Sequence, residues 1–227
     1  MNTKTTVLHQ WEISPFCGKV RRILDAKNIP YKTKNYNGAL VPLAAKLTGV
    51  GKLPVLDIHG DRISDSRNIA HHLEKTFPDS TRLIPSVELQ YAEMARYEDW
   101  ADASLYWYNF YFRLKYDDAW SKTATHFSRG RPTYEKLIVN LMGRKKFMRQ
   151  LDSQGLGRYP KQVVEERFRV LIKNLDVTLS DREWLVGDNK TLADIAVASQ
   201  LHEIKRTSHL ASELTALPSL NDWLNRT

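Results

Sequence analysis

The stretch Gly51-Lys-Leu-Pro-Val-Leu-Asp-Ile-His-Gly-Asp-Arg-Ile-Ser-Asp-Ser66 decides the fold of the first part of this chain. Apolar residues flank the turn His59-Gly60-Asp61, a pattern that predicts two short strands joined by a hairpin. Residues 66–77 then carry apolar side chains every four positions, which predicts a helix with one buried face. The stretch therefore indicates the strand pair and closing helix of a small α/β unit.

The residues before this stretch predict the remaining part of the same unit. An apolar run at 6–11 predicts a strand, a helix begins at Pro15, and a second extended run covers 31–36. A short helical piece follows at 41–47. This β-α-β order, completed by the hairpin and its helix, predicts an α/β domain over residues 1–79.

Strand patterns nearly vanish after a polar, proline-bounded connection at 78–85. From there the sequence predicts an all-helical domain over residues 87–227. Its helices are expected over 87–113, 132–151, 160–180 and 191–206, with a short one near the end. Residues 114–131 are expected to be irregular. Thr191 and Asp194 have the spacing of a capping box, which indicates a role in folding.

The composition is that of a globular protein, with 42% hydrophobic residues and only 10 Gly and 9 Pro among 227 residues. No apolar run approaches a membrane span, and residues 1–11 lack the apolar core of a secretory signal, so we expect a cytoplasmic protein with no membrane partner. The single cysteine, Cys17, excludes an intramolecular disulfide and a Cys-rich zinc site. The histidines lack metal-ligand spacing, so no metal is expected.

Positive charge is concentrated in one segment of the predicted helical domain. The chain has a formal net charge of +8, and residues 121–161 hold ten Lys/Arg but only two Asp/Glu. Such a segment favours anionic partners. Four interpretations stay open: a solvated helix face, a surface that steers the substrate, a site for an acidic protein partner, or a nucleic-acid contact. No RNA-binding or helix-turn-helix signature supports a nucleic-acid partner.

Four local motifs, in their order along the chain, resemble those of the glutathione transferase superfamily. They are Ser14-Pro-Phe-Cys17, Gly51-Lys-Leu-Pro-Val55, Asp65-Ser66, and Trp184-Leu-Val-Gly187 followed by Thr191-Leu-Ala-Asp-Ile195. The resemblance spans nearly the whole chain and is to the serine-type, bacterial-like members. It implies a thioredoxin-like α/β domain followed by an all-α domain, glutathione as co-substrate, and a homodimer.

Ser14 is the residue that this resemblance indicates for thiol activation. A transferase of this kind must hold glutathione as its thiolate, because the thiolate is the nucleophile. A hydroxyl at the positive end of the helix that begins at Pro15 can donate a hydrogen bond to that sulfur. The alternative is that Ser14 is only a helix N-cap, since Ser before a Pro at the first helical position is common capping chemistry.

Cys17 is the second catalytic candidate. It lies three residues after Ser14, which is the resolving rather than the attacking position of a C-x-x-C redox motif. A buried, inert thiol is therefore expected, with mixed-disulfide exchange with glutathione as the alternative.

The resemblance also assigns residues to glutathione. The residues expected to contact it are Phe16, Lys52, Leu53, Pro54, Asp65 and Ser66. The Leu53–Pro54 peptide bond is expected to be cis, so that Leu53 offers its backbone to the cysteinyl moiety, and Lys52 is expected to meet a carboxylate. Asp65 is expected to pair with the γ-glutamyl ammonium, although the family commonly has Glu there. Ser66 is expected to cap the following helix and to donate to a carboxylate.

An aromatic-rich stretch from Tyr97 to Phe112 is expected to supply part of a substrate pocket. Tyr106, Phe110 and Arg113 share one helical stripe that can face an apolar electrophile above the glutathione sulfur. Trp11, at the end of the first strand, is expected to complete this pocket. The alternative is that the aromatic stripes belong to the core.

These assignments predict a glutathione transferase that conjugates glutathione to a small apolar electrophile, or displaces a group from it, as in detoxification. Two other functions stay open. The first is an adaptor or binding protein of the same fold that acts through the basic surface 121–161. The second is a glutathione-dependent thiol oxidoreductase that acts through Cys17.

Overall fold

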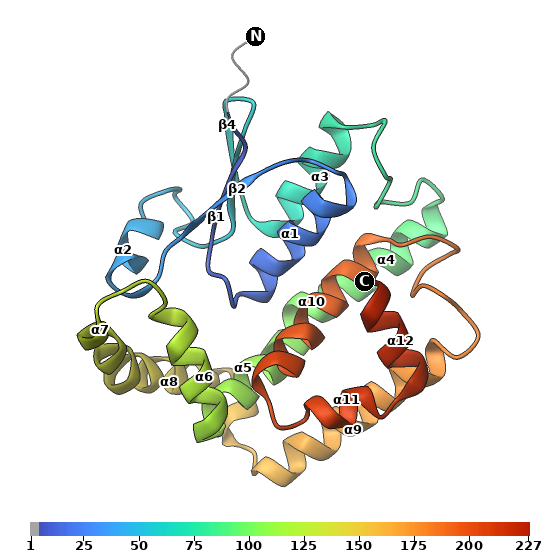
Figure 1. Ribbon diagram of the computed structural model, residues 1–227. Helices are drawn as coiled ribbons and strands as arrows, with labels where there is room; N and C mark the ends of the chain where they lie inside the picture. The colour runs from blue at the N-terminus through green and yellow to red at the C-terminus, as the bar shows by residue number, and fades with distance from the viewer. Residues whose placement is uncertain (1–4) are drawn as a thin grey trace.

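The N-terminal half of the protein is built on a four-stranded sheet (Figure 1). The computed structural model describes residues 5–227, without the side chains of residues 138, 139 and 141. The strands are β1 (Val7–Gln10), β2 (Lys32–Asn35), β3 (Val55–Ile58) and β4 (Asp61–Ser64). Their order in the sheet is β2-β1-β3-β4, with β1 parallel to β2 and antiparallel to β3. Strands β3 and β4 are antiparallel and form the predicted hairpin.

Two helices of this half, α1 (Pro15–Ala26) and α3 (Ser66–Thr76), pack side by side (Figure 1). Helix α1 buries Val20, Ile23 and Leu24, which join the same apolar cluster as Leu8 of β1 and Leu56 of β3. The short helices η1 (Gly38–Leu40) and α2 (Val41–Ala44) connect β2 to β3. The predicted thioredoxin-like α/β arrangement is therefore confirmed.

The second half is helical, as predicted. Its elements are α4 (Glu88–Trp100), the π-helical turn η2 (Ala101–Leu105), α5 (Tyr106–Lys115), α6 (Asp117–Phe127), α7 (Thr133–Ile138), the π-helical turn η3 (Val139–Gly143), α8 (Arg144–Gln154), η4 (Leu156–Arg158), α9 (Lys161–Thr178), α10 (Leu192–Thr207), α11 (Ala211–Thr215) and α12 (Pro218–Arg226). No helix among residues 5–227 is both long enough and apolar enough to cross a membrane. The boundaries 1–79 and 87–227 stay a prediction, although neither helix nor strand occurs between α3 and α4.

The prediction of an irregular segment at 114–131 is wrong over most of its length, because α6 lies there. Its residues Ala119, Trp120, Thr123 and Ala124 are buried on one side, and α6 packs on α5. The sequence of α6 is rich in Asp, Ser, Thr and His, which are weak helix formers. Tertiary packing of its single apolar side outweighs that low propensity.

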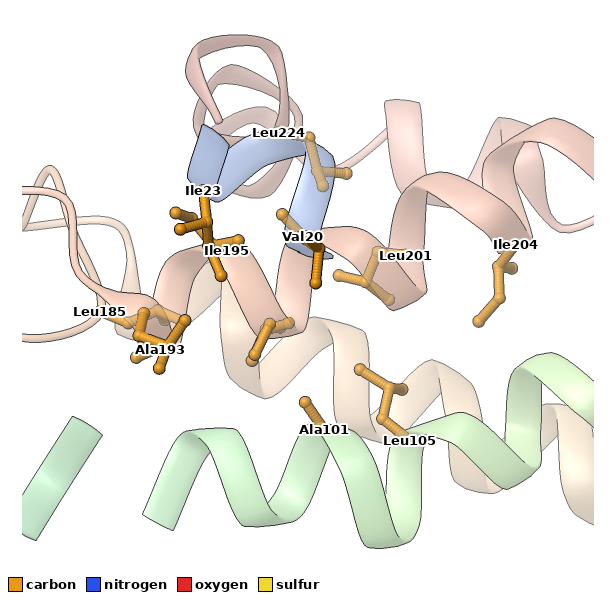
Figure 2. Packing of buried hydrophobic residues seen from close by; sticks show 14 of the residues in the cluster. Val20, Ile23, Ala101, Leu105, Leu185, Ala193, Ile195, Leu201, Ile204 and Leu224 are labelled. Atoms are coloured by element: carbon orange, nitrogen blue, oxygen red, sulfur yellow. The ribbon is translucent and has the colours of Figure 1, made fainter. Parts of the chain in front are cut away.

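Helix α10 is the centre of the molecule. It packs against α1 on one side and against α4 and η2 on another. Apolar side chains of α1 and η2 meet those of α10 in one cluster (Figure 2). Almost every residue of its first three turns is buried, which is typical of a helix surrounded by protein. Because α1 belongs to the N-terminal half and α4 to the C-terminal half, α10 joins the two halves into one apolar core.

The start of α10 is fixed by Asp194. The predicted capping box is present, since Thr191 N–H donates to Asp194 Oδ2 at 2.9 Å and the Thr191 side chain completes the pair. The same fully buried carboxylate accepts hydrogen bonds at Oδ1 from Leu185 N–H at 2.8 Å and from Trp223 Nε1 at 2.9 Å. One side chain therefore ties together the loop before α10, the first turn of α10, and α12.

Asp194→Ala is predicted to lower the free energy of unfolding by about 3 kcal/mol or more. The substitution leaves several buried donors without an acceptor, and each such donor costs about 1–3 kcal/mol. Urea denaturation followed by circular dichroism measures the change. Asp222→Ala, on the exposed side of α12, is the matched control and should change stability by less than about 0.5 kcal/mol. A loss below about 1 kcal/mol for Asp194→Ala would contradict the anchoring role.

Candidate functional site

Ser14 lies at the N-terminus of α1 and is its N-cap residue. Its backbone is extended, with φ −78° and ψ 124°, Pro15 occupies the first helical position, and Ser14 Oγ accepts a hydrogen bond from Cys17 N–H at 3.4 Å. Because Oγ acts as an acceptor in this contact, its own proton remains available for donation. The capping function and the donor function predicted from the sequence are therefore compatible in one side chain.

The segment around Pro54 lies next to the loop that leads to Ser14. Strand pairing places Val55 opposite His9, so the same antiparallel register carries Leu53 and Pro54 toward the end of β1 and Trp11. The Leu53–Pro54 peptide bond is cis, as expected. Leu53 is half-buried and Lys52 is exposed. Two of the sequence motifs, far apart in the chain, thus meet at the carboxyl end of β1.

Asp65, rather than Ser66, is the N-cap of α3, which corrects the expectation for this pair. Asp65 Oδ1 accepts hydrogen bonds from Arg67 N–H at 2.9 Å and from Asn68 N–H at 3.3 Å. Ser66 is the first helical residue and is buried. The left-handed backbone of Asp65, with φ 76°, turns its short carboxylate back onto the first turn of the helix.

A partly buried group of charges lies between α1, the start of α3, α4 and η2, and the sequence did not predict it. Lys19 Nζ donates to Glu98 Oε1 at 2.7 Å and to Asp102 Oδ2 at 2.9 Å, while Arg67 pairs with Glu98 Oε2 at 3.1 Å and with Asp99. Lys19 and Glu98 are almost completely buried. Burial raises the pKa of Asp102, although Lys19 opposes this shift. We name these five residues the interdomain ion cluster.

Two charged residues within apolar stripes of the sequence indicate the interdomain ion cluster. Lys19 stands four residues before Ile23 on the buried stripe of α1, and Glu98 stands four residues after Met94 on that of α4. A charged residue within an apolar stripe indicates a buried ionic partner, because an isolated buried charge is very unfavourable. The sequence could not show that the two charges are partners.

Six aromatic side chains form a continuous chain of ring contacts, which we name the aromatic chain. In order they are Trp11, Phe127, Phe147, Phe110, Tyr106 and Phe16, with successive ring centroids 5.6, 6.1, 5.6, 5.6 and 5.1 Å apart. All six are half-buried. Its two ends, Trp11 and Phe16, stand on either side of Ser14 in the sequence. The structure thus brings together the predicted pocket residues Trp11, Tyr106 and Phe110, and adds Phe127 and Phe147.

Arg113 does not belong to the aromatic chain. Its guanidinium is buried and donates from Nη2 to Glu203 Oε2 of α10 at 2.6 Å. Burial lowers the pKa of Arg113, while Glu203 opposes this shift. The structure therefore places this predicted pocket residue in an ion pair between α5 and α10.

An ion pair and hydrogen bonds connect the turn between α6 and α7 to the N-terminal half near Trp11. Arg129 Nη1 contacts both carboxylate oxygens of Glu12, at 2.7 and 2.8 Å, and Asn37 Nδ2 donates to the Arg129 carbonyl at 3.0 Å. Ala39 N–H donates to Glu135 Oε2 at 2.8 Å. These contacts hold the α6–α7 turn over the loops that follow β1 and β2.

The basic segment 121–161 is only partly free. Three of its arginines, Arg129, Arg131 and Arg144, form ion pairs with carboxylates of this chain. The cations that are exposed without such a pair in the described part of the chain are Lys122, Lys145, Lys146, Arg149, Arg158 and Lys161. The acidic-partner interpretation stays a prediction that rests on these side chains.

Several histidines are engaged in contacts within the protein. His9 is buried, with Nδ1 2.8 Å from the Tyr36 hydroxyl and Nε2 3.0 Å from Asp57 Oδ2. His209 Nε2 lies 3.1 Å from Glu165 Oε1. Among residues 5–227, no group of three or more His, Cys, Asp or Glu is arranged to hold a metal ion. The absence of a metal stays a prediction.

Cys17 is completely buried in the first turn of α1. Burial raises the pKa of its thiol to about 11, although the nearby side chain of Ser14 and backbone of Trp11 lower it. A thiol with this pKa is almost entirely protonated near pH 7 and is a poor nucleophile. The geometry favours the inert role over thiol exchange.

Replacement of Lys19 by Met is predicted to lower the free energy of unfolding by about 3–5 kcal/mol, because it leaves Glu98 buried with fewer positive partners. The double variant Lys19→Met/Glu98→Gln should recover part of this loss, since it removes the unpaired charge. Chemical denaturation compares both variants with Lys75→Met, a change of an exposed lysine on α3. Equal losses in the single and double variants would contradict the ionic origin of the effect.

Cys17 in the native protein is predicted to react with an alkylating reagent at pH 7.5 more than about tenfold more slowly than in urea, because burial suppresses both access and thiolate formation. Mass spectrometry over time measures the modified fraction. Cys17→Ser should keep glutathione-dependent turnover. Rapid labelling of the folded protein, or loss of turnover in the variant, would support the oxidoreductase alternative instead.

Models of the glutathione S-transferase family match both halves of the chain. The N-terminal domain model matches residues 8–81 and the C-terminal domain model matches residues 139–227. Isoprene-epoxide–glutathione S-transferase of Rhodococcus sp. strain AD45 is 27% identical over 221 residues, covering 95% of this chain and 91% of the relative. Protein LigF of Sphingobium sp. strain SYK-6 is 25% identical over 200 residues, covering 80% of this chain and 71% of the relative.

One further relative and two solved structures are also similar to this chain. Failed axon connections of Drosophila melanogaster is 27% identical over 211 residues, which cover 86% of this chain but 48% of that protein. A glutathione S-transferase structure from Rhodospirillum rubrum superposes with a TM-score of 0.68 at 20% identity, covering 97% of this chain and 86% of the other. The β-etherase LigF structure superposes with a TM-score of 0.65 at 19% identity, covering 99% and 100%. With both of its halves matched by family models, the chain belongs to the glutathione S-transferase superfamily.

Proposed function

We propose that this protein is a glutathione transferase in which Ser14 Oγ donates a hydrogen bond to the glutathione thiolate. In the reaction the sulfur attacks an electrophilic carbon, a C–S bond forms, and the bond to a leaving group or a strained ring oxygen breaks. The observation that carries the proposal is the position of Ser14, which caps α1 just after the end of β1, toward which the register of β3 carries the Leu53–Pro54 segment.

The interactions available at Ser14 are strong enough to lower the pKa of the glutathione thiol by about two units. A thiol with a pKa of about 8.5 needs about 2.7 kcal/mol of selective stabilisation of its anion to lower the pKa by about two units. A hydrogen bond to a charged group supplies about 1.5–3 kcal/mol, and the positive end of α1 adds about 0.3–1 kcal/mol. A dedicated general base is therefore unnecessary.

The contacts with the rest of glutathione are proposed from the same geometry. The backbone of Leu53 pairs with the cysteinyl moiety, and the exposed Lys52 meets a carboxylate. Asp65 is exposed at the start of α3, where its carboxylate can meet the γ-glutamyl ammonium while its Oδ1 caps the helix. Ser66 donates from the same helix start, and Phe16 covers the thiol from the side of the aromatic chain.

The aromatic chain supports an apolar electrophile. Its six rings come from both halves of the protein, and its two ends, Trp11 and Phe16, flank Ser14 in the sequence. Aromatic faces favour apolar and planar ligands. The names of two relatives, an isoprene-epoxide transferase and a β-etherase, agree with glutathione-dependent attack on such molecules. We propose an apolar epoxide, aryl ether or halide as the substrate class, in a cytoplasmic homodimer with a detoxifying role.

Ser14→Ala is predicted to lower kcat/KM for glutathione-dependent turnover by about 10- to 100-fold, the value of one charge-assisted hydrogen bond. Ser14→Thr keeps the hydroxyl and should retain most activity. Ser14→Asp keeps an oxygen that can cap α1 but cannot donate to a thiolate, so it should lose activity without losing the helix cap. Turnover is measured with halonitroaromatics, epoxides and enals, and the thiolate by its ultraviolet absorbance.

Ser153→Ala, on the exposed side of α8, is the control and should leave both readouts unchanged. Glutathione binding that persists in Ser14→Ala while the thiolate signal falls supports the proposal. Full activity in Ser14→Asp, or a folded wild-type protein that neither binds glutathione nor turns over any substrate of the panel, would overturn it.

A further inference from the structure

A second concave site lies on the surface formed by α1, α10 and α12. This hollow has a volume of about 630 Å³. Its lining includes four cationic side chains, Arg21 and Arg22 of α1 and Lys205 and Arg206 of α10, and two carboxylates, those of Asp25 and Glu203. None of the residues proposed to contact glutathione or the electrophile lines it. We name it the cationic hollow.

The two arginines of α1 are brought close together by a glycine. A Cβ atom at Gly18 would lie 3.3 Å from Arg22 Nη1 and 3.4 Å from Arg21 Nη2, so both guanidinium groups lie over the Cα of Gly18. Side chains of a helix point toward its N-terminus, which explains why residues 21 and 22 reach back to residue 18. Two like charges held this close repel each other, and an anion between them removes that repulsion.

Of the four cations of the hollow, only Arg206 has a carboxylate partner in the described part of the chain, since it pairs with Glu203 and Glu12. Arg21 donates to the side-chain oxygen of Gln10 and to the Glu12 carbonyl, which are neutral, and Arg22 donates to the Gly18 carbonyl at 3.5 Å. Among the residues that the structure describes, no carboxylate oxygen lies within 4.0 Å of the charged nitrogens of Arg21, Arg22 or Lys205.

The two carboxylates do not balance this charge. Glu203 is already shared, since Arg113 contacts its Oε2 at 2.6 Å from the interior and Arg206 contacts the same oxygen at 2.7 Å. Asp25 is exposed. The hollow therefore has a surplus of positive charge that its own residues leave uncompensated.

The pKa of a neighbouring histidine is affected by the same positive charges. His202 lines the hollow, and its pKa is lowered to about 4, chiefly by burial and further by the positive charges of Arg22 and Lys205. The imidazole is thus neutral between pH 5 and 8. The positive charge of the hollow comes from arginine and lysine side chains and is independent of pH over this range.

From this placement we infer that the cationic hollow binds a small phosphate-bearing anion. Guanidinium groups match phosphate oxygens with paired hydrogen bonds, and cations that approach from two helices suit a ligand with more than one negative charge. The volume lies within the range of small-molecule sites. The carboxylates of Asp25 and Glu203 disfavour an extended polyanion such as a nucleic acid, because it would pass over them.

Inorganic pyrophosphate is the probe for this site, titrated into the full chain by calorimetry at constant ionic strength. Saturable binding of one equivalent is expected for the wild type. Arg22→Gln/Lys205→Gln should weaken it by about tenfold or more, the loss expected for charge-assisted hydrogen bonds. Asp25→Asn removes a repelling carboxylate and should strengthen binding, a gain that misfolding cannot produce. Lys173→Gln, an exposed cation on α9, should have no effect.

The following outcomes would contradict the inference. Absence of saturable heat, equal affinity in the wild type and the folded double variant, or equally tight binding of citrate would overturn a phosphate site in this hollow. Loss of pyrophosphate binding in the presence of saturating glutathione would place the anion at Ser14 instead. A failure of the glutathione proposal leaves this test unaffected, since pyrophosphate binding needs neither turnover nor glutathione.

Discussion

The structure depends on the burial of α10 and on the carboxylate that fixes where this helix begins. Asp194 accepts hydrogen bonds from the loop before α10, from Thr191 at the cap, and from Trp223 of α12. With its start fixed, α10 can pack against α1 and against the η2 turn at the same time. An apolar helix surrounded on several sides needs such an anchor, because hydrophobic contacts alone do not specify its position along its own axis.

The interdomain ion cluster adds specificity to this apolar contact. Lys19 comes from α1 and its partners come from α4 and η2, so their pairing fixes the rotation of α1 relative to the C-terminal half. A buried ion pair contributes little net stability but penalises arrangements in which its charges separate. The same rotation sets the contact between Phe16, in the first turn of α1, and Tyr106 of α5, whose ring centroids lie 5.1 Å apart.

The proposed active site uses features that also serve the fold. Ser14 caps α1, Asp65 caps α3, and Pro54 directly precedes β3, so each is positioned by an adjoining element of regular structure. A hydrogen-bond donor held in this way requires little reorganisation when the thiolate forms. The cationic hollow lies elsewhere on α1 and α10, and it shows that the same pair of helices can present a second, electrostatic surface.

Much of the fold could be predicted from the sequence, because strand and helix periodicity, Pro15, the turn at Gly60 and the Thr191–Asp194 spacing are local signals. The helix α6 could not, since its stability comes from packing on α5 and not from propensity. Among the site residues, Ser14 and Pro54 stood in recognisable motifs. The choice of Asp65 over Ser66 as the cap depended on a backbone angle that a sequence does not display.

The sequence by itself determined the four strands and most of the helices, the capping box of α10, and which hydroxyl stands before α1. Only the tertiary structure decided which side chains meet: Arg113 with Glu203, Lys19 with Glu98, and Phe127 with Trp11. The reason is physical. Capping and periodicity act over a few residues of one chain segment, whereas these pairs join residues about 80 to more than 110 positions apart, and such contacts form only when packing brings the segments together.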